Sequence, residues 1–386
     1  MTQIAYLFFL SLLFFGNLSA ALEETLSASL SPPYTYFENL YLDIGSETFY
    51  TVGGQGIERA ALAGFQDRKV TFSSASSTDE IAPAENIEVV PGGTIFLFEA
   101  PKCSFLTHFF HLLEHVVGVW SFYGNMHCED IKQIVLCGKF GKSWKGPNEI
   151  NRHLFKALFP HAEVFIWDDF LSKYRRQSVL KIEQALTSDR VVTFGLPICR
   201  KLNKFLGEAQ SAISKDALDT LSSRVNAYAL TPLKENQCLK ITYLKRPLPR
   251  ALAPDVEKVF IERLSQIPNT TFHAYDFAKL SFKEQINVIG TTDLLISVHG
   301  NGLSHILFLP PHSCVIEIFP PDAHLLDYRL FADVRGIEYF GIISNWGILS
   351  REAAYGAGPY GNSNRTITQL NLDLITAIVQ RRIHMR

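Results

Sequence analysis

The sequence predicts an α/β protein built from two Rossmann-like domains that face a cleft. Three observations predict this fold class. Helical and extended patterns alternate along most of the chain, a polar connector that contains a proline interrupts them at residues 231–237, and the length of 386 residues suits two domains of ordinary size. Each half is too short for an eight-stranded barrel, so each is expected to be a doubly wound sheet.

The elements are assigned from the spacing of apolar residues. Apolar residues three and four apart indicate helices, and continuous apolar runs such as Ile134 to Cys137 indicate buried strands. After short β-like runs over about residues 34–98, the expected order is helix 107–120, strand 131–137, helix 148–159, strand 162–167, helix 173–186, strand 190–194 and helix 215–228. These elements belong to an N-terminal domain at residues 22–230.

The alternation restarts beyond the connector. The expected order there is strand 239–244, helix 254–266, strand 271–274, helix 281–289, strand 294–298, helix 302–308, strand 314–318 and a last helix 368–380. This second series defines a C-terminal domain at residues 238–386, whose last helix packs either on its own sheet or back on the N-terminal domain.

The composition excludes two classes of protein. With 47% hydrophobic and 19% charged residues, the chain is too apolar to be disordered as a whole. Its 36 Lys and Arg against 38 Asp and Glu give a net charge of −2, which provides no basic field for nucleic-acid phosphates. We therefore expect no nucleic-acid partner.

The first 21 residues predict a signal segment. The run from Ile4 to Leu22 is almost wholly apolar and is followed by Glu23 and Glu24. Cleavage after Ala21 would make it a secretory signal peptide, whereas retention would make it a single membrane anchor that is just long enough to span a bilayer. Both alternatives place the rest of the chain in the lumen of the endoplasmic reticulum or Golgi, or outside the cell.

Two further features concern that compartment. The six cysteines permit up to three disulfides, although several fit equally well as buried thiols in strands. Asn269 and Asn364 each begin an Asn-x-Thr sequon, which predicts glycosylation at the surface.

The most informative motif is a turn that contains two glycines. The buried strand 294–298 leads into His299-Gly300-Asn301-Gly302 and then directly into an apolar helix. Unpaired backbone N–H groups and the helix dipole suit an anionic group at such a turn, and the glycines leave room for a diphosphate. His299 is placed for a hydrogen bond to a phosphate or to the substrate. A structural tight turn without a ligand explains the two glycines equally well.

The segment around this turn resembles the signature of glycosyltransferase family 61. The positions that fit are His299, Gly300, Gly302, Leu303, Phe308, Leu309, Pro310, Glu317 and Pro320, whereas Asn301 replaces the family's Ala. Upstream, residues 281–286 with Asp293, and Arg246-x-x-x-Arg250 with Glu257, are also similar to the family. The resemblance is strong over residues 239–320, weaker over residues 103–200 and does not cover the first 80 residues.

The resemblance implies an inverting transferase of the GT-B type. Members of the family include plant N-glycan β-1,2-xylosyltransferases and enzymes that place N-acetylglucosamine on EGF domains. The N-terminal domain would bind a glycan or glycoprotein acceptor, and the C-terminal domain would bind UDP-xylose or UDP-N-acetylglucosamine as co-substrate. No cofactor is expected, and since the sequence contains no Asp-x-Asp triplet, no required metal is expected.

Specific roles follow for the matched residues. Arg246 and Arg250 would bind the diphosphate, unless they are surface residues beside a Pro-rich loop, and Glu317 would accept hydrogen bonds from the ribose. In the first half His111 matches the family, and Glu114 lies one position early.

Inverting transfer needs a general base at the acceptor hydroxyl, which predicts that Glu114 or His111 is this base. The alternative is that His111, like His108 and His115, is an ordinary helix residue. At the level of the whole protein, the alternative is an inactive or lectin-like secreted binding protein that keeps the fold.

Overall fold

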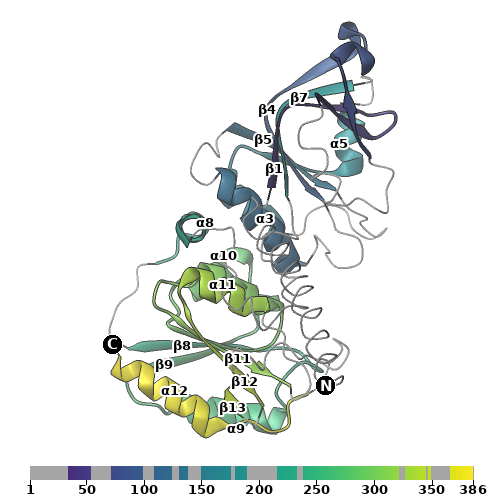
Figure 1. The fold of residues 1–386 in the computed structure, drawn as a ribbon. Coiled ribbons are helices and arrows are strands. Elements are labelled where there is room, and N and C mark those ends of the chain that lie inside the picture. Colours follow the sequence, from purple (N-terminus) through teal and green to yellow (C-terminus); the bar gives the residue numbers. More distant parts are fainter. Residues whose placement is uncertain are drawn as a thin grey trace, which may run out of the picture.

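The structure is a computed structural model. It describes residues 34–53, 71–98, 108–123, 130–137, 149–174, 179–188, 215–232, 238–320, 327–344, 347–348 and 366–385. The described residues form two α/β units, each built on its own sheet (Figure 1). The predicted α/β class is confirmed. The predicted signal segment, the strand 190–194, most of the connector 231–237 and the sequon at Asn364 lie outside the described residues.

The first unit contains a seven-stranded sheet within the described part of the chain, in the order β3-β2-β1-β7-β4-β5-β6. The strands are β1 (Tyr34–Asp43), β2 (Thr48–Val52), β3 (Thr71–Ala75), β4 (Ile87–Phe98), β5 (Ile131–Cys137), β6 (Glu163–Ile166) and β7 (Val179–Ser188). Strands β7, β4, β5 and β6 are parallel, and β1 is antiparallel to both β7 and β2. Helices α3 (Phe109–Tyr123) and α4 (Glu149–Leu158) cover one face, and α5 (Trp167–Lys173) covers the other.

The prediction of a helix at residues 173–186 is wrong. Most of that stretch is strand β7, which pairs with β1 on one side and β4 on the other. Because β7 is a central strand covered on both faces, by the cluster of Leu186 on one and by that of Leu180, Ile182 and Ala185 on the other, its apolar residues do not alternate strictly with polar ones. The resulting spacing imitates a helical period, which periodicity alone cannot distinguish from a strand.

The second unit contains a six-stranded sheet within the described residues, in the order β13-β12-β11-β10-β8-β9. The strands are β8 (Leu239–Leu244), β9 (Thr270–Tyr275), β10 (Leu294–Val298), β11 (Cys314–Phe319), β12 (Glu338–Ile343) and β13 (Gly347–Ile348). Strands β8 to β12 are all parallel, and β13 is antiparallel to β12. The predicted strands 239–244 and 294–298 are confirmed to the residue.

Helices cover both faces of this second sheet. They are α9 (Pro254–Ser265), α10 (Phe282–Gly290), α11 (Asp327–Arg335) and α12 (Leu372–His384), with the 3₁₀ helix η5 (Asn301–Phe308). Helices α9 and α12 lie on one face, and α10, η5 and α11 lie on the other (Figure 1). The last helix, α12, therefore packs on its own sheet, through Ile375, Ile378 and Val379.

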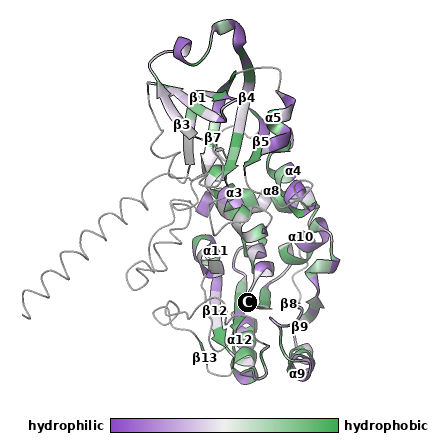
Figure 2. Ribbon diagram, turned by 90° about the vertical axis from the view of Figure 1, so that its right-hand side faces the viewer, coloured by the Kyte–Doolittle hydropathy of each residue, from purple (hydrophilic) through white to green (hydrophobic). Residues whose placement is uncertain are grey.

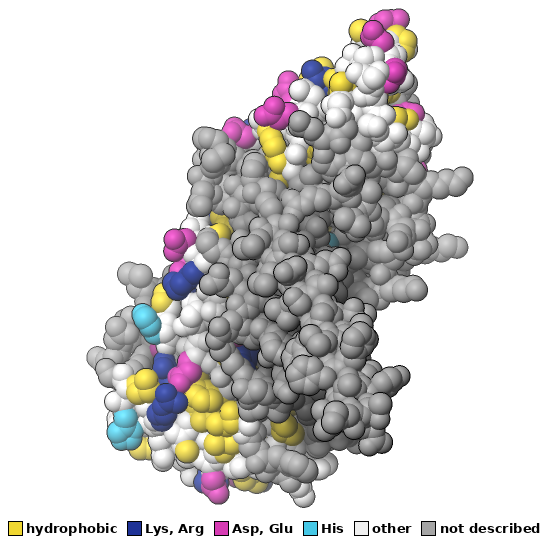
Figure 3. All heavy atoms as spheres, viewed as in Figure 1, with side chains coloured by type: hydrophobic (Ala, Val, Ile, Leu, Met, Phe, Trp, Pro, Cys, Tyr) yellow, Lys and Arg dark blue, Asp and Glu magenta, His cyan; other side chains and the backbone are white. Residues whose placement is uncertain are grey.

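The surface and the cysteines agree with the composition. On the face shown in Figure 3, the described Lys and Arg side chains lie among Asp and Glu.

Cys137 and Cys314 are buried in β5 and β11, as expected of strand thiols. Asn269 is exposed in the turn before β9, where a sequon can accept a glycan. No helix in the described part of the chain is both long and apolar enough to cross a membrane.

Helix α8 (Lys215–Ala229) lies between the two units, beside α4 and α10 (Figure 2). One continuous apolar cluster runs from Leu97 and Leu136 of the first sheet through Leu218 and Val225 of α8 to Leu295 of the second sheet. The units therefore share a core, and the predicted connector follows a helix that both units contact.

A buried cation fastens α8 to the second unit. The guanidinium of Arg335, at the end of α11, donates to the Leu307 and Leu309 carbonyls at the end of η5. Its Nε lies 2.7 Å from Asp219 Oδ1 on α8, and the Arg335 side chain is only 2% exposed. Asp219 also pairs with Lys215 on the surface of α8.

This arrangement predicts that substituting Asp219 destabilises the protein more than substituting its exposed partner Lys215. Asp219→Ala leaves the Arg335 charge buried without its partner, so we expect the free energy of unfolding to fall by about 2 kcal/mol. Lys215→Ala removes only the exposed partner and should cost less than about 0.5 kcal/mol. Urea unfolding curves of the two variants measure both values. Equal losses would show that the buried pair does not stabilise the shared core.

Candidate functional site

The strand order of the second unit places the predicted turn at a reversal point. The order reverses between β8 and β10, which are neighbours although α9, β9 and α10 separate them along the chain. In open α/β sheets, ligands bind beyond the carboxyl ends of the strands at such a reversal. Lys245 and Arg246 follow β8, and His299 follows β10, so these segments meet at one edge.

Arg246 lies directly against the glycine turn. Its Nη1 donates to the His299 carbonyl at 2.7 Å. A Cβ atom at residue 300 would lie 1.0 Å from the same nitrogen, and Gly300 has a φ of 149°, which side-chain-bearing residues rarely adopt. Gly300 is therefore required here by both the backbone and the guanidinium. The structure thus brings together three predicted site residues.

The other turn residues begin helix η5. Leu303 N–H donates to the Gly300 carbonyl, and the Ser304 hydroxyl donates to Asn301 Oδ1 at 3.1 Å. Asn301, which replaces the family's Ala, thus takes part in the first turn of the helix. A Cβ at Gly302 would meet Leu244 Cδ1 at 3.2 Å, a much milder approach than at Gly300.

His299 is held by a buried carboxylate. Its Nδ1 lies 2.5 Å from Glu317 Oε1, and the Tyr339 hydroxyl donates to Glu317 Oε2. Glu317 lies within β11 and is fully buried. Both carboxylate oxygens thus face protein groups, and the predicted contact of Glu317 with a ribose stays a prediction.

Arg250 lies in the loop that connects β8 to α9. That loop is anchored by Ile367, whose N–H donates to the Ala251 carbonyl and whose own carbonyl accepts from Ala253 N–H, each at 2.8 Å. Arg250 is partly exposed, four residues beyond Arg246. Its predicted contact with a diphosphate stays a prediction.

His111 and Glu114 are both in helix α3, but their side chains lie outside what the structure describes. The first residue of α3, Phe109, packs on the second unit: its ring centroid is 5.1 Å from that of His305 in η5. The helix that carries the predicted base therefore begins against the helix that carries the glycine turn.

His305 is a buried residue of this region that the sequence reasoning missed. Its Nδ1 lies 3.0 Å from the Gly302 carbonyl and its Nε2 3.0 Å from Gln285 Oε1, among aromatic rings that include Phe109 and Phe277. Burial lowers the pKa of His305 to about 4, and the bond to Gly302 opposes this only in part. The histidine is therefore neutral at pH 7 and carries one N–H, which it donates either to the Gly302 carbonyl or to Gln285 Oε1 of α10. Because His305 stands within an apolar stretch of the sequence, no local pattern indicated this role.

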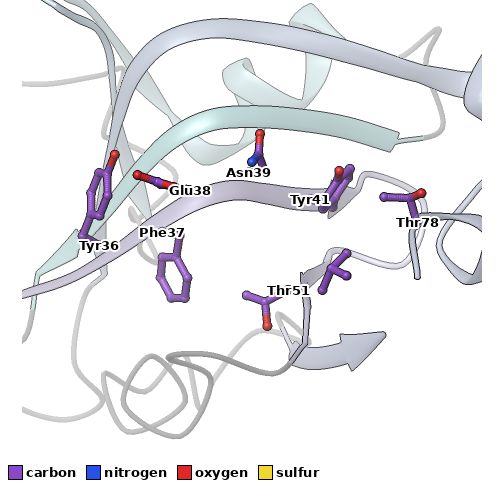
Figure 4. A pocket seen from close by; sticks show the side chains of 8 residues that line it. Tyr36, Phe37, Glu38, Asn39, Tyr41, Thr51 and Thr78 are labelled. Carbon is purple, nitrogen blue, oxygen red and sulfur yellow. The ribbon is translucent and has the colours of Figure 1, made fainter. Parts of the chain in front are cut away.

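A separate pocket lies in the first unit, where β2 leaves β1 (Figure 4). It has a volume of about 660 Å³. The side chains around it are Tyr36, Phe37, Glu38, Asn39, Tyr41, Thr51, Val52 and Thr78. None of these is a residue for which the sequence predicted a role. Among the residues that the structure describes, no group of three or more His, Cys, Asp or Glu could hold a metal ion.

A family model and several known proteins match this chain. The model of the glycosyltransferase 61 family matches residues 109–316, which is more than half of the chain and includes α3, the glycine turn and the first half of β11. This range joins the second unit to the part of the first unit that packs against it.

Several similar proteins carry the name EGF domain-specific O-linked N-acetylglucosamine transferase. That of Drosophila melanogaster is 29% identical over 150 residues, covering 36% of this chain and 26% of the relative. That of Mus musculus is 37% identical over 68 residues, covering 17% of this chain and 12% of the relative. The matches thus span about a quarter or less of these longer proteins.

The two glycines of the turn should respond differently to an added methyl group. Gly300→Ala forces Arg246 away from the His299 carbonyl and strains the backbone, so we expect the free energy of unfolding to fall by about 3 kcal/mol. Gly302→Ala needs only a small shift of Leu244 and should cost about 1 kcal/mol or less. Denaturant unfolding compares the two variants. A larger loss for Gly302→Ala would contradict the described packing.

Neutral His305 should make stability depend on pH. Because its pKa in the folded protein lies below the ordinary 6.5, the unfolded chain binds more protons between pH 6.5 and about 4. The contribution of neutral His305 to the free energy of unfolding is complete above pH 6.5. It is lost as the pH falls, by about 1.4 kcal/mol per pH unit within this window. Urea titrations across the window should show a shallower dependence for His305→Gln than for the unaltered protein. The same slope in both would refute the assignment.

Proposed function

This chain belongs to the glycosyltransferase 61 family and is a glycosyltransferase, and we propose that it moves xylose or N-acetylglucosamine from a UDP-sugar to a hydroxyl of a glycan or glycoprotein, with inversion at the anomeric carbon. The observation that carries the proposal is the glycine turn at the reversal of strand order. There the Arg246 guanidinium lies against Gly300, between the ends of β8 and β10. The turn presents a cation, backbone N–H groups and an imidazole at one edge.

The chemistry of this edge suits the diphosphate of a nucleotide sugar. The guanidinium of Arg246 has further N–H groups besides the one bonded to His299, and a guanidinium can bind two phosphate oxygens at once. The turn that begins η5 adds oriented N–H groups. As the sugar leaves, negative charge grows on the diphosphate, and these fixed donors stabilise it without reorganisation. We propose that the transfer needs no metal ion.

In this proposal the two units bind the two substrates as in a GT-B arrangement. The second unit binds the donor, the first unit binds the acceptor, and the reaction takes place between them. Two observations support it: the second sheet has its reversal at the glycine turn, and α3 of the first unit begins against η5. Glu114 or His111 of α3 then serves as the general base for the acceptor hydroxyl.

The compartment and the donor are inferred from separate observations. The predicted signal segment and the exposed sequon at Asn269 suit the lumen of the secretory pathway. The names of the relatives favour N-acetylglucosamine, whereas the family resemblance leaves xylose open. The acceptor is proposed only as a glycan or glycoprotein.

A donor screen tests the proposal. UDP, UDP-N-acetylglucosamine and UDP-xylose are each added to the purified protein, and a bound donor should raise the unfolding temperature, since a ligand at about 100 times its Kd stabilises by about 2.7 kcal/mol. Radiolabelled sugar transfer to a glycoprotein fraction then separates an enzyme from an inactive binding protein. No shift with any UDP compound would contradict the donor site.

Two arginine substitutions locate the site. Arg250→Ala should weaken UDP binding about tenfold, because a charged hydrogen bond to phosphate is lost. Arg263→Ala is the matched control, since Arg263 pairs with Asp373 on the surface between α9 and α12. We expect its UDP affinity to be unchanged. Calorimetric titration measures both affinities, and full affinity in Arg250→Ala would mean that the diphosphate lies elsewhere.

A further inference from the structure

We propose that Tyr339 is a positioning residue for His299 and acts on it through Glu317. The inference rests on the proposed function only for the identity of the ligand that His299 contacts, a nucleoside diphosphate. The three side chains come from the end of β10, from β11 and from β12, which are adjacent strands of the second sheet.

The register of these strands explains how the groups meet. Glu317 pairs with Ser297 on one side and with Gly341 on the other. Tyr339 is two residues before Gly341 and therefore shares its face of the sheet. Because residue 341 has no side chain beside Glu317, the phenol of Tyr339 can reach the carboxylate.

The two contacts fix the protonation of the cluster. Burial, and then the charge of Glu317 and its hydrogen bond, raise the pKa of Tyr339 well above its usual value, so the phenol stays protonated and donates. With one oxygen accepting from this hydroxyl, the other oxygen of Glu317 accepts from His299 Nδ1, which must then carry a proton.

The ring of His299 is also held on its faces. Its centroid lies 5.4 Å from that of Phe319, nearly stacked, and 5.4 Å from that of Tyr328. Within the described part of the chain, the remaining ring nitrogen, Nε2, has no hydrogen-bond partner, and the His299 side chain is 4% exposed. With Nδ1 bonded to Glu317, Nε2 is thus the ring nitrogen through which His299 contacts the ligand at the turn.

A double-mutant cycle tests whether Tyr339 acts through His299. Calorimetric titration with UDP compares the unaltered protein, Tyr339→Phe, His299→Gln and the double variant. We expect each single substitution to weaken UDP binding by about tenfold, and the double variant to bind as His299→Gln does, because Tyr339 has nothing left to position. Additive losses, or no loss in Tyr339→Phe, would overturn the proposal.

Tyr243→Phe is the matched control. The Tyr243 hydroxyl donates to Glu257 Oε1 at 2.9 Å in the same sheet, so this variant loses a similar tyrosine–glutamate bond without touching His299. We expect a change in UDP affinity of less than twofold. An equal loss in Tyr243→Phe and Tyr339→Phe would mean that general loosening of the sheet explains the effect.

A measurement without ligand separates this inference from the proposed function. The ring nitrogens of histidine are labelled with ¹⁵N, and the signals of His299 are identified by their loss in His299→Gln. We expect Nδ1 to be protonated in the unaltered protein and in Tyr243→Phe, and its signal to shift in Tyr339→Phe and Glu317→Gln. Unchanged signals in Tyr339→Phe would refute the inference, whereas absence of UDP binding in the unaltered protein would refute only the proposed ligand.

Discussion

The second unit is organised around a guanidinium that occupies the space where residue 300 would otherwise carry a side chain. The contact of Arg246 with the His299 carbonyl joins the ends of two strands that are neighbours in the sheet but distant in sequence. It requires β8 and β10 in register, a glycine at the turn, and a β8–α9 loop anchored by Ile367. Ile367, near the end of the described residues, thus supports the contact between Arg246 and the His299 carbonyl.

The turn is also supported from the first unit. Helix η5 follows the turn, and its buried face belongs to the apolar cluster that continues through α8 into α3 and α4. Arg335 binds the last carbonyls of η5 and the carboxylate of Asp219 together. In the middle of the same helix, His305 Nε2 lies 3.0 Å from Gln285 Oε1 of α10. Packed side chains therefore connect α8 to the turn.

The sequence predicted the parts of this site that depend on short segments. Strands β8 and β10 and the glycine turn have local signals: an apolar run, then residues that only a tight turn needs. It did not predict β12 or the bond from Tyr339 to Glu317, since a contact between adjacent strands depends on register, which no local pattern records. Strand β7 was mistaken for a helix because burial on both faces removes the alternation that identifies a strand.

The pairing of β1 with β7 has a consequence for synthesis. Tyr34 pairs with Ser188, so β1 leaves the ribosome long before the strand that completes its edge. Until then a segment with three tyrosines and one phenylalanine has one edge without a partner, and its only charges are Glu38 and Asp43. Such segments associate readily with other chains. The first sheet therefore stays incomplete until residue 188 has been synthesised, whereas the parallel pair of β8 and β9 is separated by a single crossover that contains α9.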